Sequence, residues 1–335
     1  MVFIRRILYL FYYLKESDWK ELRRFQRYAS ESSGKLKINI ILDSVLSVVK
    51  YNISFKDYYC FRFYDRCRSE RSEWAGTGFM YEYQLRMNPK GSRELLENKV
   101  QFLKHYKLFV KRKSLHISDF KSDILILNDM LLNPSGRLVL KGSRGQVGAE
   151  VEVVNSERYT PLKLLSYMKQ KNYDLIEEFV IQHSALDNLS PSGLNTVRII
   201  TQLDNDEIVF LAARLRISVN SPVDNMAAGN IAAPVDLKSG TVTGPGVFSD
   251  ITKNSVLVHP VTGKEIEGFI IPHWEKVLEL AAIAARNASG NKSVGWDIAV
   301  TKDGAELIEG NHNWCKLLWQ LPVNRGLKGE LLRFM

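Results

Sequence analysis

The period of the hydrophobic pattern changes along the chain, and this change constrains the fold most strongly. From Trp19 to about Arg112, aromatic residues and leucines recur at spacings of three and four, which is typical of helices. Breaks fall at residues 32–34 and 88–91, where serine, glycine and proline interrupt the pattern. Beyond a turn signal at residues 133–136, apolar residues instead form short alternating runs, which are typical of strands.

These patterns predict an α+β fold in which antiparallel sheets and helices follow an α-rich N-terminal region. Because the pattern changes near residue 130, we place a domain boundary there. We expect strands at residues 137–141, 147–154, 196–203 and 208–219. Helices are expected at residues 161–172 and 274–287, the second directly before a final hairpin.

The composition is that of an ordinary globular protein. The chain has 335 residues, of which 45% are hydrophobic and 25% charged, and this excludes a disordered or collagen-like chain. Three cysteines, Cys60, Cys67 and Cys315, cannot form a disulfide framework and lack zinc-ligand spacing. A reducing compartment is therefore the simplest expectation.

The net charge of +9 is concentrated in the first part of the chain. Residues 1–150 contain 28 Lys and Arg against 16 Asp and Glu, a net charge of +12, which leaves −3 for residues 151–335. Such a basic half attracts anions, and nucleotide phosphates, an anionic polymer and acidic lipid headgroups all fit. The alternative is a basic surface that only contacts solvent. We expect no nucleic acid partner, because no zinc finger, aromatic RNA-binding motif or reading helix accompanies the charge.

The N-terminal segment contains eight consecutive apolar or aromatic residues, at positions 7–14. A membrane span needs about 20 such residues, and residues 15–18 offer no small-residue cleavage site for a signal peptide. We expect a buried first helix and a cytoplasmic location. The alternative is a helix at the inner face of a membrane, with five arginines near lipid phosphates: Arg5, Arg6, Arg23, Arg24 and Arg27.

The most informative segment is residues 294–311, where two strand-like runs flank Lys302-Asp303-Gly304. A three-residue hairpin loop, with Gly304 in the left-handed conformation, would pair Thr301 with Ala305. This pairing determines which side chains of the two strands face each other.

The register brings Asp297 opposite Glu309, and Asn311 projects from the same face because strand side chains alternate. Ile298 and Ile308 then point together to the apolar face. Two facing carboxylates repel unless a cation lies between them, and carboxylate and amide oxygens suit Mg²⁺. We therefore expect Asp297 and Glu309 to face solvent and a metal ion. The alternative is a pair of solvated acids, and a one-residue register change would separate them.

A strand that ends in Lys141 leads directly into a glycine-rich loop, Gly142-Ser143-Arg144-Gly145-Gln146-Val147-Gly148. Glycines let the backbone approach an anion closely and point its N–H groups at phosphate oxygens, and Lys141 adds a positive charge. The lysine precedes the glycines and a strand follows them, so the loop is neither a Walker-type loop nor a dinucleotide-binding fingerprint. The plain alternative is an ordinary hairpin.

Residues 173–183 alternate apolar and acidic side chains. An extended segment there could hydrogen-bond an adenine edge through its backbone while its acids hold Lys141; a linker strand is the plainer alternative. Arg198 and Arg216 suit a phosphate or carboxylate that needs two hydrogen bonds, although a surface ion pair is the usual role. His183 is expected either at the rim of the site or in simple packing.

Together these segments resemble the ATP-grasp superfamily, and most closely its sugar-transfer-associated members, which are encoded with polysaccharide-assembly enzymes. The matching stretches occur in the family's order and cover about residues 95–320. They are residues 140–148, 175–183, 194–201, 223–230, 295–297 and 308–311.

The resemblance implies a role for each candidate site residue. ATP would be bound by Lys99, Lys141, Gly142, Ser143, Gly145, Gly148, Glu177, Glu178, Val180 and His183. Among these, Glu178 and Val180 would hold adenine through backbone groups. Magnesium would be held by Asp297, Glu309 and Asn311. Arg198 or Arg216 would hold an acyl-phosphate.

The implied organisation is an α-rich region at residues 1–95, a small subdomain with the phosphate loop at 96–180 and a large subdomain with the metal site at 181–335. The implied activity is that of an ATP- and Mg²⁺-dependent carboxylate–amine ligase. Its substrates would be a sugar acid, an amino acid or a sugar-linked precursor in surface polysaccharide biosynthesis. The alternatives are a kinase of a sugar hydroxyl and a non-catalytic nucleotide-binding accessory protein of a glycosyltransferase at the membrane.

Overall fold

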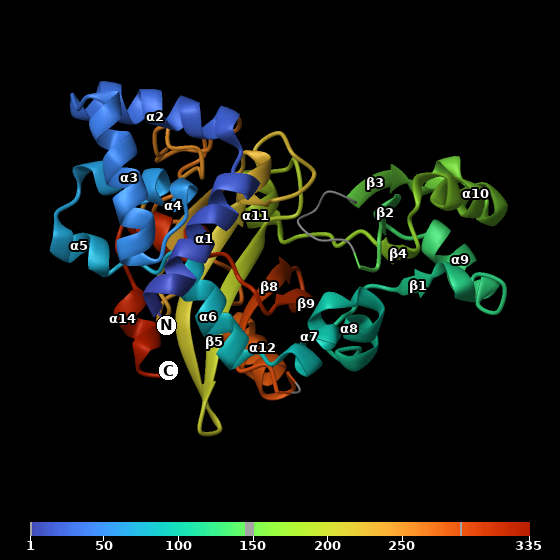
Figure 1. Cartoon of the computed structure of the whole chain (residues 1–335). Coiled ribbons are helices and arrows are strands. Elements are labelled where there is room, and N and C mark those ends of the chain that lie inside the picture. The colour runs from blue at the N-terminus through green and yellow to red at the C-terminus, as the bar shows by residue number, and fades with distance from the viewer. Residues whose placement is uncertain (1, 145–150, 289) are drawn as a thin grey trace.

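The computed structural model describes residues 2–144, 151–288 and 290–335, and its strands form two antiparallel sheets (Figure 1). The smaller sheet has the order β1-β4-β2-β3, formed in that order by Ser114–His116, Leu175–Glu178, Arg137–Lys141 and Val151–Asn155. The larger sheet has the order β7-β6-β5-β8-β9, formed by Ile231–Val235, Glu207–Ile217, Thr196–Asp204, Ser293–Thr301 and Gly304–Asn311. The predicted α+β class with antiparallel sheets is confirmed.

A helical region precedes the first strand, as predicted. Its helices are α1 (Val2–Glu16), α2 (Trp19–Ser33), α3 (Lys37–Tyr51), α4 (Phe55–Cys60), α5 (Arg68–Ser72), α6 (Thr77–Met87), α7 (Lys90–Glu97) and α8 (Lys99–His105). Asp18 caps α2 by accepting two backbone N–H groups, and Gly34 ends this helix in the left-handed conformation with φ of 69°. Asn88 ends α6, so both predicted breaks are confirmed.

The first helix is not buried as predicted. Of the α1 side chains that the structure describes, only Tyr13 is buried, whereas Ile4, Leu8 and Phe11 are 65%, 62% and 64% exposed. The run at residues 7–14 is apolar around most of the helix, and only one side of a helix can pack against a single core. None of the described helices is long and apolar enough to cross a membrane.

The core of this helical region is instead filled by aromatic residues from α2, α4 and the segment that follows. Its largest buried side chains include Phe25, Tyr58, Phe61, Phe63 and Trp74. The rings of Phe61 and Trp74 lie 4.4 Å apart between centroids. Because these rings already fill the space between the helices, α1 packs at the edge of the core and keeps its outer side in solvent.

The larger sheet is buried on both faces. One face packs against α12 (Trp274–Arg286) through Val277 and Ala281, and α8 adds Phe102 to the same cluster. The other face packs against α6 and the C-terminal segment, which contains α13 (Lys316–Gln320) and α14 (Lys328–Leu332). Trp314 and Trp319 are core residues of this second layer.

Two helices cover one face of the smaller sheet, and on the other face Leu175 joins the core of the larger sheet. Helices α9 (Ile124–Leu131) and α10 (Pro161–Lys171) pack against Leu138, Leu140 and Ile176, and Figure 1 shows this sheet and its helices as a lobe beside the larger sheet. Strand side chains alternate, so Lys141 and Glu177 project from the opposite face.

Most predicted elements are confirmed to within two residues at each end: β2, β5, β6, α10 and α12. The strand predicted at residues 147–154 is confirmed from Val151 onward, and residues 145–150 lie outside the described residues. The sequence analysis missed β1, β7 and α11 (Ser184–Leu189). Strand β1 has only three residues, and β7 contains Pro234, which is tolerated because β7 lies at the edge of its sheet.

Candidate functional site

The β8–β9 hairpin carries the predicted metal ligands, and its register differs from the prediction at the turn. Thr301 pairs with Gly304, so the loop has two residues and the predicted three-residue loop is wrong. Asp297 nevertheless pairs with Glu309, as predicted. A β-bulge between Asp297 and Ile298 shifts the register by one residue, and this shift compensates for the shorter turn.

The bulge also changes the apolar face of the hairpin. Ile298 pairs with the buried Leu307, so the prediction that Ile308 shares this face is wrong, and Ile308 is half-buried. Asn311 lies two positions after Glu309, and its Nδ2 donates to a Glu309 carboxylate oxygen at 3.1 Å. The structure thus brings these two predicted ligands into contact.

Asp297 is buried, which contradicts the prediction that it faces solvent. The residue is only 1% exposed. Arg198 pairs with Asp297 across the β5–β8 ladder. Its Nε donates to Asp297 Oδ1, and its Nη2 donates to Asp297 Oδ2 at 2.7 Å. Arg216 on β6 donates from Nη1 to the same Oδ2 oxygen at 2.6 Å. Burial alone would raise the pKa of the Asp297 carboxyl, but the two guanidinium groups lower it well below its usual range.

Arg216 links Asp297 to a second buried carboxylate, that of Asp224. Arg216 Nη2 lies 2.7 Å from Asp224 Oδ1, and Oδ2 accepts the backbone N–H of Thr196 at 2.8 Å. Burial raises the pKa of the Asp224 carboxyl to about 6, and the nearby Asp297 carboxylate also raises it. Arg216 lowers this pKa but does not offset the effect of burial. The predicted phosphate-binding arginines therefore lie together, and buried aspartates balance their charges.

On the smaller sheet, Lys141 pairs with Glu177 on the neighbouring strand. Lys141 Nζ lies 2.6 Å from Glu177 Oε1, and both side chains are largely buried. The prediction that an acid of residues 173–183 holds this lysine is confirmed. The pair lies on the sheet face that α9 and α10 leave uncovered, which directs the lysine away from the small hydrophobic core.

A residue that the sequence analysis did not single out, Arg112, connects the two sheets. Its Nε donates to Glu177 Oε2 at 2.6 Å, and its Nη1 donates to Glu306 Oε1 at 3.0 Å and to the Leu307 carbonyl at 2.9 Å. Its Nη2 donates to the Ile308 carbonyl on the same strand at 3.2 Å. A continuous path of buried ionic contacts therefore runs from Lys141 to β9.

The sequence offers little signal for this residue. Arg112 stands between Lys111 and Lys113, and a short basic run of this kind usually lies in solvent. Glu306 alternates with apolar neighbours in β9, but a carboxylate on the polar side of a hairpin would produce the same pattern.

Lys99, the other predicted ATP-binding lysine, reaches the start of the glycine-rich loop. Its Nζ donates to the Gly142 carbonyl at 3.0 Å, and its backbone N–H donates to the Ser143 carbonyl at 2.9 Å. Ser143 is in turn held by Asp174, which accepts its backbone N–H at 2.6 Å and its hydroxyl at 2.7 Å. The other predicted loop residues, Gly145 and Gly148, lie outside the described residues.

The predicted hinge residues lie at the end of β4 and just beyond it. The Glu178 backbone N–H donates to the Lys113 carbonyl at 2.9 Å, so only its carbonyl could accept an adenine amino group. Val180 is buried.

His183 caps α11, because its Nδ1 accepts the Ala185 N–H at 3.1 Å. His183 also lines a pocket that includes Phe179 and, from the β8–β9 turn, Lys302.

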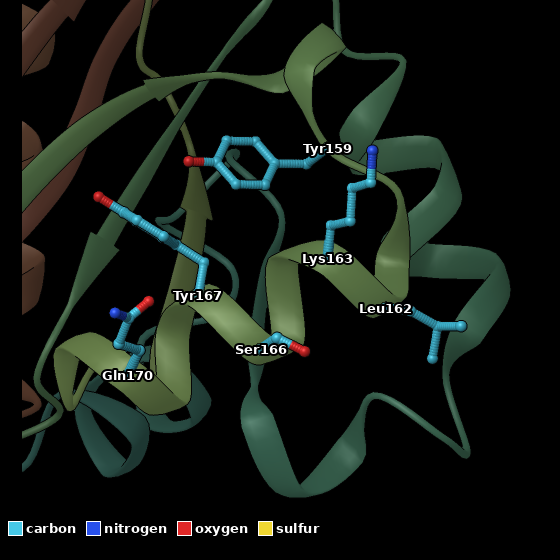
Figure 2. Close-up of a pocket in the computed structure, with 6 residues that line it drawn as sticks. All are labelled: Tyr159, Leu162, Lys163, Ser166, Tyr167 and Gln170. Atoms are coloured by element: carbon cyan, nitrogen blue, oxygen red, sulfur yellow. The ribbon is translucent and has the colours of Figure 1, made fainter.

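A second pocket lies beside α10. Figure 2 shows its lining side chains, which come from α10 and the residues before it: Tyr159, Leu162, Lys163, Ser166, Tyr167 and Gln170. None of the predicted site residues lines it. The ionic groups described above therefore gather elsewhere, on the face of the smaller sheet opposite α9 and α10 and on the β5, β6, β8 and β9 strands of the larger one.

With this geometry established, the comparisons identify the family. The sequence model described as sugar-transfer associated ATP-grasp matches residues 79–335, which is most of the chain. The chain belongs to the sugar-transfer associated ATP-grasp family. The predicted family is therefore confirmed. No curated protein sequence matches this family member.

Several solved structures are similar to this ATP-grasp family member. D-alanyl-alanine synthetase A from Vibrio cholerae O1 biovar eltor str. N16961 has 13% identity and a TM-score of 0.44, over 72% of this chain and 64% of that one. The ATP-grasp ligase PsnB, complexed with precursor, Mg and ADP, has 15% identity and a TM-score of 0.42, over 74% and 60%. L-amino acid ligase from Bacillus licheniformis has 12% identity and a TM-score of 0.39, over 71% and 49%. The chain thus spans less than two thirds of the length of each of these proteins.

Membership of an ATP-grasp family implies ATP and Mg²⁺, and the predicted ligand set fits a hard cation. Asp297, Glu309 and Asn311 offer carboxylate and amide oxygens from paired strands. Both Asp297 oxygens accept guanidinium N–H groups, so a metal ion at this carboxylate would share it with Arg198 and Arg216. Within residues 2–144, 151–288 and 290–335, no group of three His, Cys, Asp or Glu side chains is arranged to hold a metal ion. The predicted ligand set is not such a group, because its third member, Asn311, is an amide.

The different surroundings of the two carboxylates predict different stability effects. Replacement of Asp297 by alanine leaves two buried guanidinium groups without their shared carboxylate, so Asp297→Ala should lower the free energy of unfolding by about 3 to 5 kcal/mol. Glu309 is half-buried, and Glu309→Ala should cost less than about 1 kcal/mol. Urea unfolding followed by tryptophan fluorescence measures both values, and equal losses would contradict the different environments.

The buried Glu177 predicts a pH dependence. Burial by itself would raise the pKa of this carboxyl, but Arg112 and Lys141 lower it from 4.5 to about 2. Because the folded pKa lies below the unfolded value, the stabilising effect is complete above pH 4.5 and is lost as the pH falls from 4.5 towards 2. The free energy of unfolding should fall less steeply in this window for Glu177→Gln than for the native chain or for the exposed control Glu157→Gln. An unchanged slope in Glu177→Gln would contradict the assignment.

Proposed function

We propose that this protein is an ATP- and Mg²⁺-dependent carboxylate–amine ligase that acts through an acyl-phosphate. The observation that carries the proposal is the buried path from Lys141 through Glu177 and Arg112 to β9. It joins the lysine beside the glycine-rich loop to the hairpin that holds Asp297 and Glu309. Nucleotide phosphates could contact both groups at once in such an arrangement.

The side chains supply charge and position rather than a nucleophile. Lys141 and Lys99 would bind the ATP phosphates, and the hinge carbonyl of Glu178 would accept the adenine amino group. Arg198 and Arg216 would hold the transferred phosphoryl group; each guanidinium has five N–H donors, and the contacts with aspartates use only some of them. Asp297, Glu309 and Asn311 would hold Mg²⁺, which when bound offsets phosphate repulsion and stabilises the transferring phosphoryl group.

The two steps balance without a covalent enzyme intermediate. A substrate carboxylate oxygen attacks the γ-phosphorus of ATP and ADP leaves, which produces the acyl-phosphate. An amine then attacks the acyl carbon, loses a proton and displaces inorganic phosphate to leave an amide. The positive charges of the arginines would favour both steps because negative charge accumulates on the phosphoryl oxygens.

The proposed substrate class is supported by the family description. Sugar-transfer association supports a sugar acid, an amino acid or a sugar-linked precursor of a surface polysaccharide as the carboxylate or amine.

We also propose a division of the chain into three parts, residues 1–95, 96–180 and 181–335. Residues 99–106 of the second part pack on the larger sheet. A cytoplasmic location and association with a glycosyltransferase belong to the same proposal.

One observation favours a second candidate, a nucleotide-binding accessory protein without turnover. Both oxygens of Asp297 are engaged by buried arginines, so the carboxylate is less available to a metal ion than in the predicted arrangement. If the two arginines keep Asp297 from binding a metal ion, the chain would bind ATP without using it.

Product analysis separates these functions. Purified protein with ATP, Mg²⁺ and a panel of sugar acids, amino acids and amines should release ADP and yield a product whose mass equals the two substrates minus water. Glu309→Ala should release no ADP, and its melting temperature should fall much less than that of Asp297→Ala. A product that gains only a phosphate would indicate a kinase. ATP binding without ADP release across the panel would contradict the ligase and favour the accessory protein.

Removal of the Lys141 charge provides a separate measurement of nucleotide binding. Lys141→Ala should weaken binding of a non-hydrolysable ATP analogue about tenfold or more, because a charge-assisted contact with phosphate is lost. Isothermal titration calorimetry measures the change, and Lys163→Ala on the outer side of α10 is the matched control. Equal affinities for the two variants would contradict the placement of Lys141 at the phosphates.

A further inference from the structure

The helical region exposes an apolar surface that no part of the described chain covers. We call it the front apolar surface, and its residues come from α1 and α3. They are Ile4, Leu8, Phe11, Tyr12, Ile38, Ile41, Leu42, Val45 and Leu46. Their exposed fractions range from 37% to 69%, so water contacts a large share of each side chain.

The helical spacing explains why these side chains gather on one side. On α3, the exposed residues recur at intervals of three and four, and they lie opposite the buried residues Ile40, Ser44 and Val48. On α1 the exposed set follows the same interval and lies opposite the buried Tyr13. Both helices therefore place an apolar stripe on their outer side, where a surface helix normally carries polar residues.

The two stripes belong to neighbouring helices. Arg6 on α1 donates to the carbonyls of Val49 and Lys50 at the end of α3, at 3.2 Å and 2.8 Å. Figure 1 shows α1 and α3 close together at the same side of the molecule. Trp19, at the start of α2, is 42% exposed, and its indole N–H donates to the Leu14 carbonyl. Exposed aromatic rings of this kind are common where a protein meets the headgroup region of a bilayer.

The segment that forms α1, α2 and α3 carries a net positive charge. Residues 1–50 contain ten Lys and Arg against five Asp and Glu, a net charge of +5. Five of these basic residues are exposed and form no ion pair with another described residue: Lys20, Arg23, Arg27, Lys37 and Lys50. A second copy docked on the same surface would bring like charges together, whereas an anionic bilayer would attract them.

We propose that the front apolar surface docks on an anionic lipid bilayer, with α1 and α3 lying in the plane of the headgroups. Helix α1 has 15 residues and is about 22 Å long, so it lies along the surface rather than across the membrane. The apolar stripes enter the boundary between headgroups and acyl chains, and the basic residues contact lipid phosphates. The inference uses no residue of the candidate catalytic site, so it stands or fails independently of the proposed ligase activity.

Vesicle sedimentation tests the proposal with the full chain. The protein should sediment with vesicles of phosphatidylcholine mixed with phosphatidylglycerol, and much less with phosphatidylcholine alone. Binding should fall at about 1 M salt, where the Debye length is about 3 Å. Leu8→Glu and Leu42→Glu should each lower the partition coefficient about tenfold or more, because each removes an apolar side chain from the lipid contact.

The matched control is Leu162→Glu, which changes an equally apolar residue that is 77% exposed on α10. It should bind vesicles like the native chain, and all three variants should keep the native melting temperature. Equal binding to neutral and anionic vesicles would overturn the proposal, as would an equal loss in Leu162→Glu. Light scattering that shows a dimer, which Leu8→Glu converts to a monomer, would instead assign the surface to a second copy of the chain.

Discussion

The contact on which the candidate site depends is a single buried guanidinium, that of Arg112, between the two sheets. A buried arginine is costly unless carboxylates surround it, and here Glu177 and Glu306 come from different sheets. The carbonyls of Leu307 and Ile308 accept its remaining N–H groups. Because the guanidinium is planar, its contacts constrain the relative orientation of β4 and β9. The position of Lys141 follows, since Glu177 holds it.

A second ionic cluster shows how the larger sheet accommodates several acids. Asp297 on β8 and Asp224 in the segment between β6 and β7 both contact Arg216, and Asp297 also contacts Arg198. Arg216 thus lies between the carboxylates of Asp297 and Asp224, whereas Glu309 accepts a hydrogen bond from Asn311. Removing either aspartate or either arginine would therefore leave a buried opposite charge with fewer partners.

The sequence by itself determined the elements and the pairing of the hairpin acids. Helical and strand periods are local properties, so β2, β5, β6, α10 and α12 could be predicted closely. The opposition of Asp297 and Glu309 was also predicted, although the two-residue turn and the bulge produce it by compensating shifts. Motif order was sufficient to recognise the family, because it records residue types at fixed distances along the chain.

Only the tertiary structure decided which charges are buried and which apolar side chains are not. The burial of Asp297 depends on Arg198 and Arg216, which come from strands about 80 to 100 positions away in sequence, as the separations of 81 and 99 show. In the sequence, Arg112 belongs to a basic run typical of a surface, and the apolar run of α1 is typical of a core. In the structure, Arg112 is buried and the outer side of α1 is exposed. The physical reason is that desolvation depends on every neighbour in space, whereas periodicity reports only neighbours along one element.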